Sequence, residues 1–259
     1  MSMTSPPDRH AERRGECRLC RNTRELQLSH FIPAALYPKT RILFGATPTA
    51  AIISPDEMAE YLLCRDCEER LNRNGESYAL RLIAPKVLRY PFPLLDLLKA
   101  ARPVQNDPGP IDQYAAADLG IDTGKLAYFA LSIAWRASVH AWQLPDGQVT
   151  EPHDLGPYTD RIRLFLLEQA AFPLGVSVVV IVCRDPFSRD YWTTPAFGDD
   201  EEWSKFHFVT RGVFFVIWIG ADLPDERRAA CCWSAPGKPV FAADCEDRLR
   251  RNLMGLPAL

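Results

Sequence analysis

The chain has 259 residues, of which 47% are apolar and 24% are charged, and its formal net charge is −3 at pH 7. This composition is ordinary for a globular protein, and the net charge gives no overall reason to bind nucleic acid. No run of about 18 uninterrupted apolar residues occurs, so we expect no membrane span and a cytoplasmic protein. Eight cysteines are too few for a disulfide scaffold at this length, which favours metal ligation for those that are paired.

Three parts are predicted along the chain. Residues 1–15 are polar and contain prolines, without the apolar core of a signal peptide, which predicts a flexible leader. A four-cysteine module and its following helices are expected over residues 16–101. Three prolines and a glycine in RPVQNDPGPID (102–112) predict a loop at the start of an α+β region, 102–259, of unassigned role.

The first part of the chain contains two CxxC pairs separated by 43 residues. A CxxC places two thiolates about one turn apart, and two such pairs complete a closed tetrahedral shell around one ion. Closed shells are structural, because no position remains for water. The sequence therefore predicts a structural zinc held by Cys17, Cys20, Cys64 and Cys67.

Helical patterns follow the module. The pattern is helical around residues 76–101, is interrupted by PFP, and resumes in LLDLLKA (94–100) with Pro93 at the first turn. Residues 123–142 predict an amphipathic helix, capped by Asp122 or Thr123. Within it Arg136 could contact a phosphate or Glu68, but we favour a packed Trp135 and an Arg136 that is paired or extends its charged end to solvent.

The remaining elements are predicted from periodicity and turn residues. A helix is expected over 161–172, ended by Pro173, and a buried strand over 176–183. Residues 205–220 predict either two strands about Arg211–Gly212 or one long bent strand, and 245–252 a short helix.

The other four cysteines do not predict a second metal site. Cys183 ends the apolar strand and is interpreted as a small core residue. Cys231 and Cys232 are adjacent, which makes ligation of one ion by both strained, and Cys245 is solitary in the sequence.

The order of motifs resembles that of the zinc-bearing HNH endonucleases. The matching stretches are CRLC (17–20), SHFIP (29–33) and LLCRDCEERLN (62–72). The set is similar to degenerate HNH-like variants in uncharacterised bacterial and phage proteins. This resemblance implies a treble-clef, ββα-metal module, here followed by helices on a small, mostly antiparallel sheet.

The same resemblance implies a metal-dependent nucleic-acid endonuclease. His30 would be the general base, and a Mg²⁺ or Mn²⁺ ion, separate from the zinc, would use Glu68 as a ligand. The sequence departs from the family pattern in having Ser29 before the histidine, Glu68 after the second CxxC, and no asparagine between His30 and Cys64. Other oxygen donors are available in Asp56, Glu57 and Asn72.

Other interpretations remain open at this stage. His30 could be structural, and Glu68 could simply favour the helix dipole. Gly75 and Glu76 are interpreted as a helix C-cap and a surface acid. The module could also be a non-catalytic zinc platform, with the C-terminal region as a surface for a protein partner. Three arginines beside the first CxxC are candidates for contacts with a nucleic-acid backbone: Arg18, Arg21 and Arg24.

Overall fold

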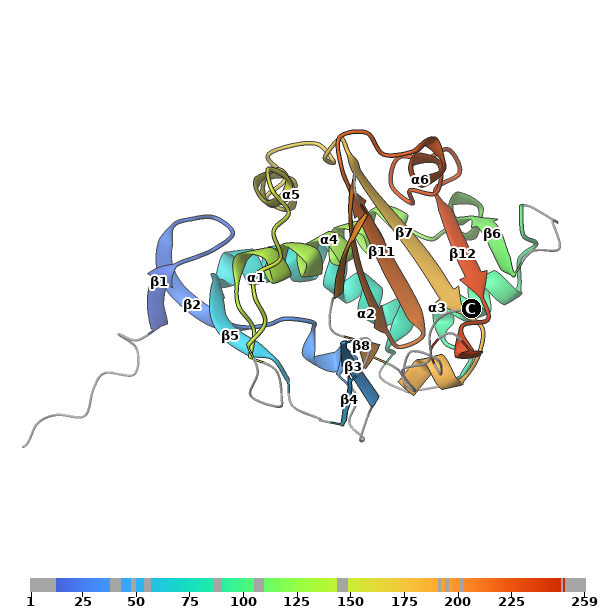
Figure 1. The fold of residues 1–259 in the computed structure, drawn as a ribbon, viewed down its shortest axis with the longest axis horizontal. Coiled ribbons are helices and arrows are strands. Elements are labelled where there is room, and N and C mark those ends of the chain that lie inside the picture. The colour runs from blue at the N-terminus through green and yellow to red at the C-terminus, as the bar shows by residue number, and fades with distance from the viewer. Residues whose placement is uncertain are drawn as a thin grey trace, which may run out of the picture.

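The computed structural model describes residues 13–37, 43–47, 50–53, 57–85, 90–104, 110–143, 149–190, 192–193, 196–200, 203–247 and 249. The fold is α+β, with helices and mixed sheets (Figure 1). Asp56 and most of the predicted leader, residues 1–12, lie outside the described residues. The first described strand begins at Arg14, inside the predicted leader.

The N-terminal module is a three-stranded sheet followed by a helix. Its strands, in the order β1-β2-β5, are Arg14–Glu16, Thr23–His30 and Ala59–Cys64. Both neighbouring pairs are antiparallel. Helix α1, Arg65–Leu71, starts directly after β5, continues into a π-helical turn, η3 (Asn72–Glu76), and then into α2, Ser77–Ile83.

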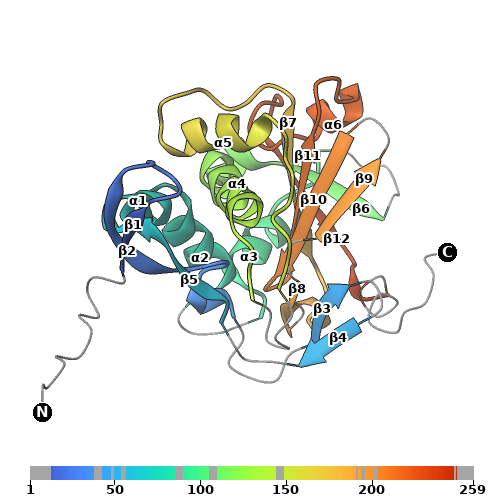
Figure 2. The ribbon, with the colours of Figure 1, turned by 60° about the vertical axis from the view of Figure 1, so that its left-hand side comes forward.

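A six-stranded sheet forms the second half, in the order β6-β12-β7-β11-β10-β9. Only the β12–β7 pair is parallel, so the sheet is mostly antiparallel, as predicted. Its strands in chain order are β6 (Ile111–Ala115), β7 (Val176–Cys183), β9 (Ala196–Asp200), β10 (Trp203–Thr210), β11 (Val213–Ile219) and β12 (Pro239–Ala243). A small third sheet, β4-β3-β8, joins Ala50–Ile53, Leu43–Thr47 and Trp192–Thr193 (Figure 2).

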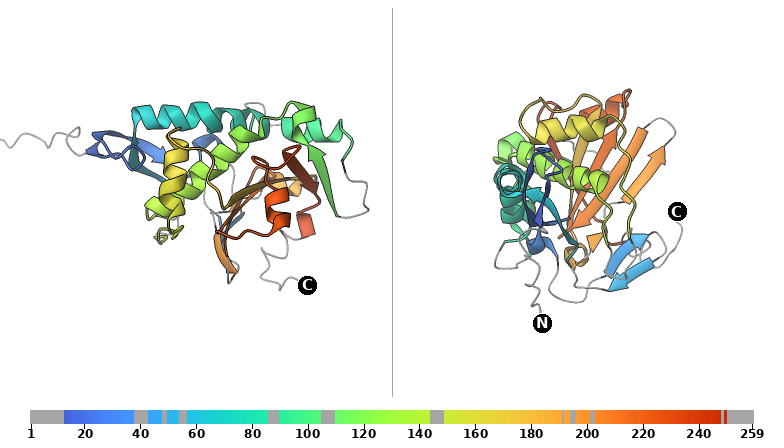
Figure 3. Two further views of the ribbon diagram at one scale, coloured as in Figure 1. Left: turned by 90° about the horizontal axis from the view of Figure 1, so that it is seen from above. Right: turned by 90° about the vertical axis from the view of Figure 1, so that its left-hand side faces the viewer.

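The remaining helices lie between these strands along the chain. They are η2 (Ala34–Leu36), α3 (Pro93–Lys99), η4 (Ala116–Leu119), α4 (Thr123–Val139), α5 (Tyr158–Leu166), η5 (Phe187–Asp190) and α6 (Asp225–Ala229). Helices α1, η3 and α2 form one continuous helix, which we call the α1–α2 coil. Figure 3 shows α4 between the large sheet and this coil. One buried hydrophobic cluster runs through the module and the second half.

Several local predictions are confirmed. Strand β7 has the predicted bounds and is buried along nearly its whole length. The Asp122 side chain accepts a hydrogen bond from the Lys125 N–H and so caps α4. Residues 205–220 form two strands, because Arg211 (φ 50°) and Gly212 (φ 81°) make the two-residue turn with positive φ that suits a hairpin. Pro93 opens α3 as its first residue.

Two helix predictions need correction. Helix α4 is not amphipathic, because it is buried nearly all round between the sheet and the α1–α2 coil. Helix α5 begins earlier than predicted and ends at Leu166 instead of 172. Tyr128 donates to the Leu166 carbonyl and Arg70 to the Leu167 carbonyl, and Glu168 adopts a positive φ of 60°, so the helix stops there.

Gly75 is not a C-cap but the point where η3 meets α4. A Cβ at this position would lie 2.8 Å from the Phe129 backbone nitrogen and 3.0 Å from its Cα. The two helices therefore approach each other more closely than any side chain at this position would allow.

Replacing this glycine is expected to destabilise the protein. Gly75→Ala should lower the free energy of unfolding by about 1–3 kcal/mol, because the added methyl forces two backbones apart. In an exposed helix the same change would stabilise by about 1 kcal/mol. Urea unfolding followed by circular dichroism measures the difference. Arg73→Ala, at an exposed position of the same turn, is the control and should change stability by under about 0.5 kcal/mol.

Candidate metal centre and adjoining pocket

The two CxxC pairs come together at one end of the N-terminal module. Cys17 and Cys20 lie in the turn between β1 and β2, whereas Cys64 ends β5 and Cys67 lies in the first turn of α1. The four sulfur atoms all lie within 4.8 Å of one another, so they form a candidate metal-binding group. The sequence spacing thus identified a real cluster.

The spacing of these sulfur atoms fits a tetrahedral ion. Four ligands at a zinc–sulfur distance of about 2.3 Å lie about 3.8 Å apart, and the Cys20 and Cys64 sulfurs are 3.9 Å apart. The Cys64 N–H donates to the Cys17 sulfur at 3.3 Å. The Cys67 thiol and neighbouring backbone N–H groups lower the pKa of Cys17 to about 4, although burial opposes this shift. The hydrogen bond with Cys17 and burial raise the pKa of Cys67, and burial raises the pKa of Cys64, so these shifts favour a thiolate at Cys17 but not at Cys64 or Cys67.

The arginines around this centre differ in their contacts. Arg21 forms an ion pair with Asp160 of α5 at 2.6 Å, and Arg163 of the same helix donates to the Leu19 carbonyl. These contacts attach the cysteine turn to the second half. Arg24 lies 3.8 Å from Asp66, and Arg18 is exposed.

His30 is the last residue of β2, where the strand reaches the edge of a pocket. Its Nε2 lies 2.8 Å from Oε2 of Glu57, and its side chain is 28% exposed. The carboxylate of Glu57 thus contacts the His30 ring, and no asparagine occurs between His30 and Cys64. When Nε2 is protonated and donates a hydrogen bond to Glu57, Nδ1 is the ring nitrogen that can accept another proton.

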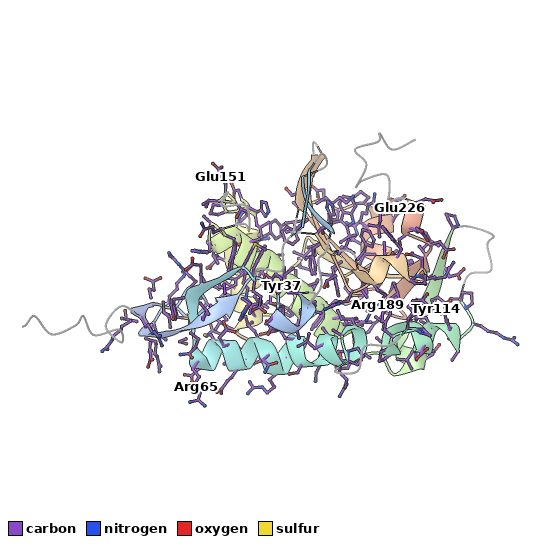
Figure 4. All side chains as sticks on the ribbon, turned by 90° about the horizontal axis from the view of Figure 1, so that it is seen from below. Tyr37, Arg65, Tyr114, Glu151, Arg189 and Glu226 are labelled. Atoms are coloured by element: carbon purple, nitrogen blue, oxygen red, sulfur yellow. The ribbon has the colours of Figure 1, made fainter. Side chains whose placement is uncertain are left out.

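The pocket lies between β2, the α1–α2 coil and α4, and its volume is about 390 Å³. Figure 4 shows the coil running on without a break from α1, which begins at Arg65. Three acids and an amide from the coil line the pocket, together with His30 and Arg136 from outside it. The coil residues are Glu68, Glu69, Asn72 and Glu76.

Arg136 reaches this pocket from α4 and contacts two of its carboxylates. Its Nη2 lies 2.8 Å from Oε1 of Glu76 and 3.7 Å from Oε2 of Glu68. The Arg136 side chain is 2% exposed and that of Glu76 is 11% exposed. Nε and Nη1 of Arg136 have no hydrogen-bond partner among the described residues. The predicted pairing of Arg136 is therefore confirmed, with Glu76 as its nearer partner.

Arg136 offsets part of the negative charge of Glu68 and Glu76. Burial raises the pKa of Glu68, and the positive charge of Arg136 opposes that rise. Burial also disfavours the charged form of Arg136, but Glu76 and Glu68 more than compensate and raise its pKa. Two carboxylates and one guanidinium leave a net negative charge on this wall, so an anionic substrate would need a cation beside it.

Ser29 has a structural contact in the pairing of β2 with β5. The strand β2 has a bulge between Gln27 and Leu28, and the Ser29 hydroxyl accepts a hydrogen bond from the Leu63 N–H at 3.1 Å. Ser29 is 1% exposed. A hydroxyl at this position replaces a ladder hydrogen bond that the bulge interrupts.

Glu76 was predicted to be a surface acid, and this prediction is wrong. In the structure Glu76 is 8% exposed and forms part of the pocket wall. The spacing Glu68, Asn72, Glu76 is four residues at each step, and this pattern places the three on one side of a continuous helix. That signal was present in the sequence and could have identified the face.

No protein-family model, no curated protein and no solved structure matches this chain. Within the described ranges, no helix has both the length and the apolar character needed to cross a membrane.

Proposed function

We propose that this protein is a zinc-containing, HNH-like nucleic-acid endonuclease that hydrolyses phosphodiesters with a divalent cation. The observation that carries the proposal is the position of His30, which lines the same pocket as Glu68 and Glu76. The turn with two cysteines, the antiparallel β2–β5 pair and the helix that begins at the second cysteine pair support a treble-clef, ββα-metal assignment. The four-cysteine ion is a structural Zn²⁺ in this proposal.

The residues of the pocket fit a hard cation. Carboxylate and amide oxygens, from Glu68, Glu76 and Asn72, are the donors that Mg²⁺ and Mn²⁺ prefer. Among the described residues, the histidine and acids of this pocket do not form a group of three ligand atoms within 4.8 Å of one another. Mg²⁺ commonly uses one or two carboxylates and keeps several waters. When bound, the ion supplies positive charge that stabilises the phosphoryl transition state.

The protein's own groups would handle the proton. The Nδ1 atom of His30 accepts a proton from the attacking water, and its hydrogen bond from Nε2 to Glu57 stabilises the resulting imidazolium. Arg136 holds Glu68 and Glu76 at the pocket wall. Glu57 thereby takes the orienting role that an asparagine has in the resembled family.

The experiment that tests the proposal is a cleavage assay with the zinc-loaded, full-length chain. Supercoiled plasmid, single-stranded DNA and RNA are incubated with Mg²⁺ or Mn²⁺. We expect cleavage that requires the ion and that His30→Ala slows about 10²–10⁴-fold, as loss of a general base does. His140→Ala, which removes an imidazole outside the pocket, should cleave at the wild-type rate. Failure of the wild-type protein to cleave any substrate would refute the endonuclease assignment.

Glu57 provides a second, smaller prediction. Glu57→Ala should lower the cleavage rate about 10–100-fold, because a hydrogen bond to a charged group contributes about 1.5–3 kcal/mol. Glu57→Gln keeps an acceptor for Nε2 and should lose less. Single-turnover cleavage rates of the wild type and the two variants test this ranking of activities. Equal rates for both variants and the wild type would show that Glu57 does not orient the base.

The alternative is a zinc platform that binds nucleic acid or a protein without cleavage. The exposed pair Leu28 and Tyr61, opposite each other on β2 and β5, favours a contact surface. Arg13 lies over the Tyr61 ring at 5.3 Å, and Arg18 is exposed on the same module. This function predicts Mg²⁺-independent binding with a steep salt dependence that weakens in Arg18→Ala. It also predicts that His30→Ala leaves this binding unchanged.

A further inference from the structure

A second group of metal-binding side chains lies at one end of the large sheet. Cys183 is the last residue of β7, and Cys245 follows the end of β12. One sulfur from each cysteine and an oxygen of Asp185 all lie within 4.8 Å of one another. From the sequence, Cys183 was expected to be a core residue and Cys245 to be solitary. The two cysteines are 62 residues apart, and no local sequence pattern predicts a contact over that separation.

The sheet topology brings these residues together. Strand β12 runs parallel to β7, with Ala243 opposite Cys183, so the chain leaves both strands at the same end. The Arg184 N–H donates to the Ala243 carbonyl at 2.9 Å and extends the pairing past the last strand residue. Both cysteines are buried and neither is in a disulfide. The position of the two cysteines beside each other is therefore fixed by backbone hydrogen bonds between the segments that hold them.

The carboxylate is held in place by its own hydrogen bonds. Oδ1 of Asp185 accepts from the Ser188 N–H at 2.8 Å and from its hydroxyl at 2.6 Å. Oδ2 accepts from the Cys245 N–H at 3.0 Å. Each carboxylate oxygen can accept more than one bond, so lone pairs remain for an ion. Carboxylate ligands of metals are commonly oriented by such hydrogen bonds.

We propose that Cys183, Cys245 and Asp185 form a second metal site, which binds a thiophilic divalent ion, Zn²⁺. Two thiolates and one carboxylate select zinc over magnesium, and a water or another oxygen donor completes a tetrahedron. Binding converts both thiols into thiolates and releases two protons per ion. The site fastens the segment after β12 to the end of β7. It lies outside the pocket of the proposed endonuclease and does not depend on that activity.

Metal content of the full-length protein tests the proposal. After expression with zinc and removal of loosely bound ions, elemental analysis should give two zinc ions per chain. Cys183→Ser/Cys245→Ser should give one. The matched control is Cys231→Ser, which removes a buried thiol that belongs to neither group and should retain two. One ion in the wild type, unchanged in the double variant, would overturn the proposal.

A second readout distinguishes lost ligands from lost folding. In protein loaded with ¹¹³Cd²⁺, a four-sulfur site and a two-sulfur, one-oxygen site differ in chemical shift, so two resonances are expected. The double variant should lose only the resonance of the site with fewer sulfurs. The surviving four-sulfur resonance then reports that the N-terminal module is intact. Asp185→Asn, which keeps both thiols, should weaken binding at this site about tenfold or more. A single resonance in the wild type, present in every variant, would contradict the inference.

Discussion

Loss of the metal ligands in the four-cysteine cluster is expected to unfold the N-terminal module. Structural zinc contributes about 10–16 kcal/mol of apparent binding free energy in small modules, and this energy stabilises the fold. In Cys20→Ser/Cys64→Ser, the turn between β1 and β2 and the start of α1 lose their common anchor. Amide hydrogen exchange resolved along the chain should show protection lost over residues 14–83 first.

The six-stranded sheet provides the internal reference for this experiment. Strands β7 and β11 are paired along their length and hold none of the four cysteines, so their amides should exchange more slowly than those of the module. Readdition of Zn²⁺ should restore protection in chelated wild-type protein but not in the double variant. Full protection of the module in metal-free protein would rule out a structural role for the ion.

Arg136→Met is expected to have the second large effect, on both stability and activity. Removing one partner of a buried ion pair costs about 3–5 kcal/mol, because the remaining charges are left uncompensated. Here the remaining charges are Glu76 and Glu68, which both contact Nη2 of Arg136 in the wild type. Urea unfolding should show this loss of stability. The cleavage assay should show loss of activity at temperatures where the variant is still folded.

A double variant separates the structural from the positioning role of Arg136. In Arg136→Met/Glu76→Gln the two charges of the closer pair are removed together, which is often close to neutral for stability, whereas Glu68 keeps its carboxylate. Stability should therefore recover while cleavage and Mn²⁺ binding do not. Arg136→Lys keeps one positive charge and should retain part of the activity. Recovery of both stability and cleavage in the double variant would show that the pair only supports the fold.

Local patterns allowed much of the fold to be predicted. The CxxC spacing identified the cysteine cluster, the β-branched run gave β7, and Asp122 marked the start of α4. Each of these depends on neighbours within a few residues. The amphipathic interpretation of α4 was wrong because burial on its other faces comes from elements elsewhere in the chain.

The pocket was harder to predict because its parts are distant in sequence. Glu57 meets His30 through the β2–β5 pairing, and Arg136 meets Glu76 through the contact between α4 and the coil. Neither pairing follows from spacing. The Cys183–Cys245 pair depends similarly on the parallel alignment of β7 and β12, which the separate strand patterns do not specify.

The π-helical turn at Asn72–Glu76 has a consequence for comparing this chain with any other. A hydrogen bond from residue i to residue i+5 encloses one more residue than the usual i to i+4 bond. The turn is therefore equivalent to a one-residue insertion, which rotates everything after it by about 100° relative to a plain helix. An alignment anchored on Cys67 without a gap would match the wrong residue to Glu76. Aligning such helices by their pocket-facing side, with one gap allowed after Leu71, would keep the acid in register.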